Sequence, residues 1–166
     1  MLLNLIGVVF EFQIHLKKQQ QFQLELNRNF EISIELPAYK TEGASGMDLM
    51  AFIKEPIQLK SQNSCLVPTG IAVAFSNEFE IQIRPRSGLA AKNNISVLNT
   101  PGTIDSDYRG EIKVILYNHG KEDFLINNKD RIAQMVLAPV IKMNFEETDE
   151  LPETIRGEGG FGSTGK

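Results

Sequence analysis

The sequence predicts an all-β domain of the jelly-roll type, a β-barrel or sandwich with one short helix and a flexible glycine-rich arm at the C-terminus. Two observations predict this fold class. Apolar and polar residues alternate with a period of two in many short runs, as strands with one buried face require. Turn-forming residues separate these runs at short intervals, which is typical of sandwiches and barrels.

The alternating runs are distributed over the first two thirds of the chain, and each predicts one strand. Their apolar positions are Phe12-Ile14-Leu16, Phe22-Leu24-Leu26, Phe30-Ile32-Ile34, Ile71-Val73-Phe75, Phe79-Ile81-Ile83 and Ile112-Val114-Leu116.

Glycine, proline and asparagine mark the turns between the predicted strands. These turn signals are Glu55-Pro56, Pro68-Thr69-Gly70, Ser76-Asn77, Asn93-Asn94, Pro101-Gly102, Asn118-His119-Gly120 and Asn127-Asn128. Only Ser87–Asn93 has a composition that suits a short helix. We expect Ser87 to be its N-cap, because a serine hydroxyl accepts a hydrogen bond from the free N–H groups of a first turn.

We divide the chain into three parts. Residues 1–20 form an N-terminal extension of unknown role, in which the apolar segment Met1–Phe10 is an extra strand or an appended piece. A degenerate targeting segment is the alternative, although the basic start and small-residue cleavage site are missing. Residues 21–143 form the β domain, with a body that ends near Val140-Ile141. Residues 144–166 form an acidic linker and the C-terminal arm.

Composition limits the partners. The net charge of −4 provides no basic field to attract nucleic acid or an anionic membrane, so we expect neither partner. No apolar run approaches the roughly 20 residues that span a bilayer. Cys65 is the one cysteine, which rules out an intramolecular disulfide and favours a reducing compartment. We therefore expect a cytoplasmic protein, with an organelle or the nucleus left open.

The C-terminal arm, Arg156–Gly165, has five glycines among its ten residues. Glycine lets backbone N–H groups turn toward an anion, Arg156 can fork onto a phosphate, and Phe161 can stack on a flat ring. This composition predicts a flap over a nucleotide, with a disordered tail as the alternative. A P-loop is excluded, because Ser163 stands where that motif needs lysine.

Three further segments carry candidate chemistry. After the turn at Pro101-Gly102, Asp105 follows Ile104 at the start of a strand in a predicted hairpin, where its carboxylate is a candidate general base or only a turn-capping group. Arg86 and Ser87 precede the short helix and suit a phosphate, although a solvated surface turn has the same composition. Asp48 either orients metal-bound water or pins a glycine-flanked turn.

Five segments, taken in order, resemble the motifs of the trimeric deoxyuridine triphosphate nucleotidohydrolases, the dUTPases. The resemblance covers the chain from about Phe22 to the C-terminus. The segments are Gly43–Leu49, Pro85–Leu89, Gly102–Gly110, Arg131–Met135 and Arg156–Gly165. Ser45 departs from the alanine usual in that family.

The resemblance implies a jelly-roll homotrimer with three active sites at subunit interfaces, each closed by the arm of a neighbouring subunit. The implied reaction is dUTP diphosphatase activity: dUTP and water give dUMP and pyrophosphate with the help of Mg²⁺. This reaction limits uracil incorporation into DNA and supplies dUMP for thymidylate synthesis. The metal would be held by substrate phosphates and water without a direct protein ligand, with Asp48 at most in an outer shell.

The resemblance also assigns roles on the nucleoside side. Asp105 would be the base for the water that attacks the α-phosphorus, and Tyr108 would pack on the deoxyribose and leave no room for a 2′-hydroxyl. Phe161 would stack on uracil. The residues that would read the uracil edge are Asn99 and the backbone of Gly102, Thr103 and Ile104, and the same tight hairpin would exclude the methyl group of thymine. Lys113 falls at a further substrate-contacting position.

On the phosphate side the resemblance implies two groups of residues. Arg86, Ser87, Gly88 and Gln134 would bind phosphates. Arg156, Gly162, Ser163 and Thr164 would close over the γ end.

Two other interpretations of the function compete with a dUTPase. Deoxycytidine triphosphate deaminases resemble dUTPases in fold but need a glutamate seven residues after the aromatic residue of the third motif, where this chain has Ile115. A non-catalytic binding protein of the same fold would be expected to lack Asp105, Tyr108 or Arg156, and all three are present.

Overall fold

The computed structural model of the chain describes residues 15–18 and 34–161, and these are mostly strands and loops. Within them α2 (Ser87–Asn93) is the one helix, and no helix is long and apolar enough to cross a membrane. The strands are β1 (His15–Lys18), β2 (Met47–Met50), β3 (Ile57–Leu59), β4 (Ser64–Pro68), β5 (Ile71–Ala74), β6 (Phe79–Arg84), β7 (Ile95–Val97), β8 (Gly102–Ile104), β9 (Lys113–Asn118), β10 (Phe124–Ile126) and β11 (Arg131–Pro139). The all-β prediction is confirmed.

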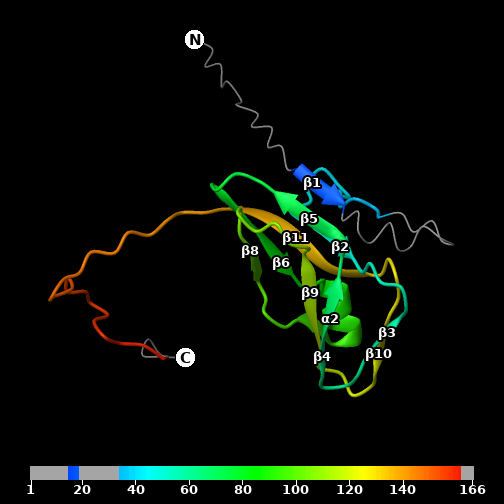
Figure 1. Cartoon of the computed structure of the whole chain (residues 1–166). Coiled ribbons are helices and arrows are strands. Elements are labelled where there is room, and N and C mark those ends of the chain that lie inside the picture. The colour runs from blue at the N-terminus through cyan, green and yellow to red at the C-terminus, as the bar shows by residue number, and fades with distance from the viewer. Residues whose placement is uncertain (1–14, 19–33, 162–166) are drawn as a thin grey trace, which may run out of the picture.

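Every strand pair is antiparallel, and the sheets join strands that are distant in sequence (Figure 1). The larger sheets have the orders β2-β11-β6-β8 and β4-β9-β7, and the smaller ones pair β1 with β5 and β3 with β10. Because β2 lies beside β11 and β4 beside β9, long connections cross the body, as they do in a jelly roll.

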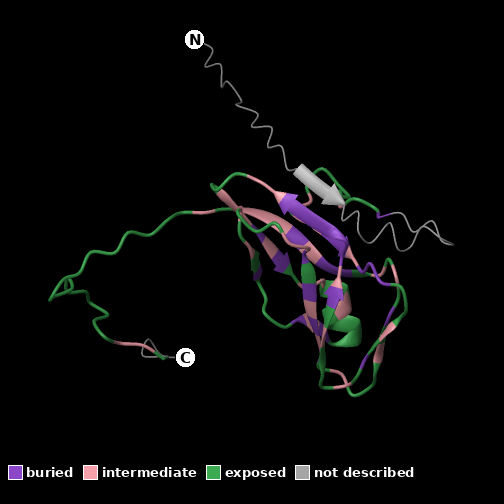
Figure 2. Cartoon of the chain, viewed as in Figure 1, coloured by how far each residue is buried: buried purple, intermediate pink, exposed green. Residues whose placement is uncertain are grey.

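The core is one apolar cluster to which both larger sheets contribute. Ile81 and Ile83 of β6 are buried, as are Val114 and Leu116 of β9, so the predicted alternation is confirmed there. Figure 2 shows stretches of buried residues along the strands of the body. Alternation puts every second side chain inward.

The predicted strands around Phe12, Phe22 and Phe30 lie largely outside the described residues. Of the N-terminal extension, β1 is described, and it pairs with β5 in the register His15↔Ala74 to Lys18↔Ile71. This part of the extension therefore adds a strand to the body.

The helix is where it was expected, but its cap is not. The N-cap is Arg86, with an extended backbone and no side-chain cap, so the prediction of Ser87 is wrong by one residue. The Arg86 carbonyl accepts the Ala90 N–H at 3.0 Å, which makes Ser87 the first helical residue. At the other end Asn94 adopts the left-handed conformation (φ 55°) that often ends helices.

The predicted hairpin around Pro101 is also wrong. The strands on either side of this turn join different sheets, since β7 pairs with β9 and β8 pairs with β6. The segment therefore carries the chain from one sheet to the other.

After β11 the chain leaves the body. The Val140 N–H donates to the Glu78 carbonyl at 2.8 Å, and residues 141–158 are all exposed. Figure 1 shows this segment, residues 141–161, leading away from the sheets, and Figure 2 shows it almost entirely exposed. Its large apolar side chains, including Ile141, Phe145 and Ile155, contact little of their own chain.

Candidate active site

A cavity of about 500 Å³ lies at the end of β8 and contains five of the predicted site residues. The predicted residues that line it are Thr103, Ile104, Asp105, Tyr108 and Lys113. Leu66 and Glu111 also line it and were not predicted. Leu66 comes from β4, far away in sequence, and nothing in the local pattern identifies it.

Asp105 is placed at this cavity by the end of β8. Ile104 pairs with Ile81 on the neighbouring strand, and Asp105 then begins a turn in which the Tyr108 N–H donates to its carbonyl at 3.1 Å. Asp105 therefore follows a strand, whereas the sequence placed it at the start of one. Its side chain is exposed and makes no hydrogen bond or ion pair to the rest of the described chain. The carboxylate is thus free to accept a proton from water.

Tyr108 is held by two hydrogen bonds, one at its ring hydroxyl and one at its backbone carbonyl. Its hydroxyl donates to the Glu111 carbonyl at 3.0 Å, and the Arg109 guanidinium donates to the Tyr108 carbonyl at 2.9 Å. Glu111 is itself held, because its carboxylate accepts the Gly70 N–H at 2.8 Å and lies 3.7 Å from the Lys113 ammonium. One wall of the cavity is therefore a hydrogen-bonded unit.

Asn99 does not line this cavity but lies against its strand. A Cβ on Gly102 would be 3.2 Å from the Asn99 side-chain nitrogen, so glycine at this position lets the amide approach the β8 backbone. This places Asn99 next to Gly102, with which it was predicted to act.

A second group of predicted residues surrounds Asp48. The Asp48 carboxylate is 7% exposed and accepts a hydrogen bond from Arg86 Nε at 2.8 Å and from Arg131 Nη1 at 3.2 Å. Burial alone would raise the pKa of Asp48, but the hydrogen bonds and charges of the two guanidinium groups outweigh it and lower the pKa. We call these three residues the arginine cluster.

The other predicted phosphate-binding residues lie around the arginine cluster. Gln134 on β11 pairs with Asp48 on one side and with Arg84 on the other. Ser87 and Gly88 are exposed in the first turn of α2, directly after Arg86. Arg131 was predicted only as part of a motif; it reaches Asp48 beside a register shift between Arg131 and Ala133.

The cavity and the arginine cluster lie toward opposite ends of β6. Asp105 continues β8 beyond the level of Ile81, toward the start of β6, whereas Arg86 continues β6 beyond Arg84. The three-residue rise from Ile81 to Arg84 alone is about 10 Å. None of the predicted phosphate-binding residues lines the cavity. One chain therefore does not bring the two groups together.

The arm holds a third group. Arg156 Nε donates to the Gly159 carbonyl at 2.6 Å, and Phe161 is exposed. Neither lines the cavity at Asp105. The predicted residues Gly162, Ser163 and Thr164 lie outside the described residues.

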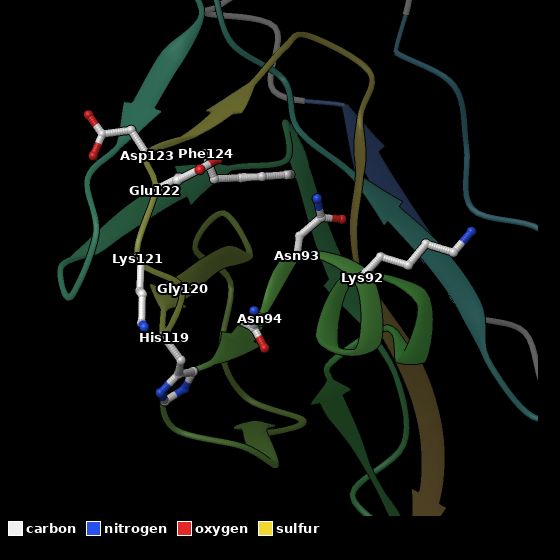
Figure 3. A pocket seen from close by; sticks show the side chains of 9 residues that line it. All are labelled: Lys92, Asn93, Asn94, His119, Gly120, Lys121, Glu122, Asp123 and Phe124. Carbon is white, nitrogen blue, oxygen red and sulfur yellow. The ribbon is translucent and has the colours of Figure 1, made fainter.

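A different cavity, of about 470 Å³, lies between the end of α2 and the turn after β9 (Figure 3). Its lining includes Lys92, His119 and Asp123, but none of the predicted site residues. His119 Nε2 lies 2.8 Å from Ser96 Oγ, which gives the imidazole a structural partner.

The described residues offer no cluster of three His, Cys, Asp or Glu side chains that could hold a metal ion. Both oxygens of Asp48 are already bonded to arginines.

Comparison with known proteins places these features in a family context. A family model described as dUTPase matches residues 33–165. The deoxyuridine 5′-triphosphate nucleotidohydrolase of Rickettsia canadensis is 57% identical over 145 residues, which cover 87% of this chain and 97% of the relative. The protein of the same name from Rickettsia felis is 55% identical over 143 residues, or 86% of this chain and 97% of the relative.

Solved structures show the same fold at low sequence identity. A mutant dUTPase of Staphylococcus bacteriophage 80alpha, solved with dUpNHpp, has a TM-score of 0.73 at 20% identity and covers 93% of this chain and 99% of its own. A mutant dUTPase from phage phi11 of S. aureus, described with a structural Mg(II) ion, has a TM-score of 0.69 at 17% identity, with 85% and 99% covered.

Proposed function

This chain belongs to the dUTPase family, and from that premise we propose that it hydrolyses dUTP to dUMP and pyrophosphate. The observation that carries the proposal is the cavity in which the open carboxylate of Asp105 lies beside Tyr108. The family match covers the segments that build this cavity and the arginine cluster. In the cell this reaction would keep uracil out of DNA and supply dUMP for thymidylate synthesis.

Asp105 is the general base of the proposed reaction. An exposed carboxylate without partners in the described chain can orient a water molecule and take its proton as that water attacks the α-phosphorus. The bond from the α-phosphorus to the bridging oxygen breaks, and pyrophosphate leaves. Asp105 thus positions the attacking water and accepts its proton.

The nucleoside is proposed to bind along β8. The backbone of Gly102, Thr103 and Ile104, with the Asn99 amide, reads the uracil edge, and Tyr108 packs on the deoxyribose. The hydroxyl–carbonyl bond from Tyr108 to Glu111 holds the ring in place, which leaves no room for a 2′-hydroxyl. Lys113 lines the same cavity and contacts the substrate.

The phosphates are proposed to bind at the arginine cluster. Asp48 orients Arg86 through its Nε, and the Arg131 carbonyl accepts a hydrogen bond from Arg86 Nη1 at 3.4 Å. The remaining N–H groups of the guanidinium, chiefly those of Nη2, would meet phosphate oxygens beside Ser87, Gly88 and Gln134. Each Asp48 oxygen keeps a lone pair, so an outer-shell contact with the metal stays a prediction.

We propose that Mg²⁺ binds with the substrate, held by phosphate oxygens and water. When bound, Mg²⁺ would neutralise part of the triphosphate charge and polarise the phosphorus that is attacked. The donor set fits this arrangement, because the groups near the predicted phosphate site are mainly cations and hydroxyls rather than carboxylates.

The complete site is proposed to form between subunits of a homotrimer. The cavity and the arginine cluster of one chain lie toward opposite ends of β6. Packing subunits side by side can bring the cavity of one against the cluster of the next. The exposed arm then reaches a neighbour, where Phe161 stacks on uracil and Arg156, Gly162, Ser163 and Thr164 cover the γ-phosphate. Cys65 is a free, half-buried thiol, which supports the proposed location in a reducing cytoplasm.

The test is pyrophosphate release from dUTP, dCTP, dTTP and UTP under identical conditions, with and without Mg²⁺. We expect rapid release from dUTP alone, and only with the metal. Equal rates with dCTP or UTP, or formation of dUTP from dCTP, would contradict the proposal.

A further inference from the structure

Gly110 lies directly against the ring of Tyr108. A Cβ built on Gly110 would overlap the Tyr108 hydroxyl and lie 2.5 Å from Cζ and 2.9 Å from Cε2. Real Cβ contacts essentially never come below 3.0 Å, so any side chain at this position would displace the ring. The Tyr108 hydroxyl occupies the space that a Gly110 side chain would fill, and from there it donates to the Glu111 carbonyl.

The backbone itself does not require glycine at position 110. Among the described glycines, Gly70 and Gly157 have positive φ, and Gly110 does not. Alanine would therefore fit the backbone conformation of Gly110 without strain. What glycine provides here is space for the aromatic ring.

We propose that Gly110 is a positioning residue that sets the discrimination between dUTP and UTP through Tyr108. This inference rests on the proposed function, in which the Tyr108 ring occupies the space of a 2′-hydroxyl. With a methyl group at position 110, the ring leaves the Glu111 carbonyl and moves toward solvent, because Tyr108 is already 44% exposed. The wall beside the sugar then opens.

The inference is tested with Gly110→Ala by measuring kcat and KM for dUTP and for UTP. We expect the KM for dUTP to rise and the kcat/KM ratio of UTP to dUTP to increase by about 10-fold, toward the value of Tyr108→Ala. The control is Gly120→Ala, whose Cβ would crowd the Asn118 side-chain oxygen at 2.9 Å, outside the site. It should lower the melting temperature without changing the ratio.

A second comparison shows whether Gly110 acts through the ring. In a Tyr108→Ala background the overlap no longer exists, so adding Gly110→Ala should change neither the ratio nor the melting temperature. An unchanged ratio in the single variant overturns the inference, and so does an equal effect in both backgrounds. If Gly110→Ala fails to fold, the melting temperatures of Tyr108→Ala and of the double variant are compared instead. Equal melting temperatures support the role of Gly110 as space for the Tyr108 ring, and a lower melting temperature of the double variant refutes it.

Failure of the proposed function is distinguishable from failure of this inference. A wild-type protein that does not hydrolyse dUTP refutes the function, whatever Gly110 does. A wild-type protein that hydrolyses dUTP selectively, with a Gly110→Ala variant of equal selectivity, refutes only the role of Gly110.

Discussion

Asp48 and Asp105 are two carboxylates in opposite circumstances. Asp48 is buried between two guanidinium groups, with both oxygens bonded and a lowered pKa. Asp105 is exposed at the rim of a cavity, and its carboxylate makes no hydrogen bond or ion pair within the described chain. A carboxylate whose two oxygens each hold a guanidinium group can orient these partners, whereas one that is open can take a proton. The difference supports the proposed roles, positioning for Asp48 and proton transfer for Asp105.

The two regions also differ in how they are held. The cavity wall at Tyr108 depends mostly on a hydrogen bond and an ion pair between residues close in sequence, from position 108 to 113, with one distant bond from the Gly70 N–H to the Glu111 carboxylate. The arginine cluster joins β2, β11 and the residue before α2, and its contacts span 38 and 83 residues of sequence. The cluster therefore depends on the assembled sheet, and the wall depends mainly on its own loop.

The largest effect is expected for Asp105→Asn. Without a base, dUTP turnover should fall by about 10²–10⁴-fold while the melting temperature stays the same, because the carboxylate makes no hydrogen bond or ion pair within the described chain. Asp107→Asn is the matched control, since Asp107 is exposed in the same turn but does not line the cavity. Near-normal turnover by Asp105→Asn would remove the distinction between the two aspartates.

Removal of residues 156–166 tests the role of the C-terminal arm. Of the deleted residues, those that the structure describes, 156–161, are mostly exposed, so the truncated protein should fold with an unchanged melting temperature. Its kcat/KM for dUTP should fall by roughly 10²-fold, because the stacking and phosphate contacts of a closing flap are lost. Unaltered kcat/KM would refute the role of the arm.

Asp48→Asn should act on binding and stability. Loss of the carboxylate frees Arg86, so the KM for dUTP should rise about 10-fold with a smaller change in kcat. The free energy of unfolding should fall by about 1–3 kcal/mol, less than for a fully buried pair because Arg131 is half exposed. Asp123→Asn removes a carboxylate away from the arginines and should leave KM unchanged; a matching rise in KM would contradict the assignment.

The smallest expected effect is a pH dependence of stability. The pKa of Asp48 is lowered on folding from an ordinary value of 3.8, so its stabilisation is complete above that pH and is lost as acid protonates it below. The difference in unfolding free energy between wild type and Asp48→Asn should be constant near neutrality and narrow below about pH 4. Urea unfolding across this range measures it, and a difference independent of pH would contradict the assignment.

Sequence patterns predicted what depends on local chemistry. The period of two predicted strands where β5, β6 and β9 are found. The glycine-flanked third motif predicted that Thr103 and Asp105 belong to one site, and both line the same cavity. What they missed depends on pairing across the fold. The turn at Pro101 suggested a hairpin, but β8 prefers β6 of the other sheet.

The same limit applies to individual residues. Ser87 suggested a helix cap, but Arg86, held extended and bonded to Asp48, takes that position. Leu66 enters the cavity only because β4 lies beside β9. No local pattern encodes contacts of that kind.

The central claim is that the cavity of one subunit works with the arginine cluster of another, and mixed oligomers test it most directly. Asp105→Asn and Arg86→Ala, each inactive alone, would be co-expressed with different tags, and the oligomers carrying both tags purified. A mixed trimer contains one interface where an intact cavity meets an intact cluster, so about a third of its sites should regain dUTP hydrolysis. Activity no greater than that of the separate variants would show that each chain builds its own site.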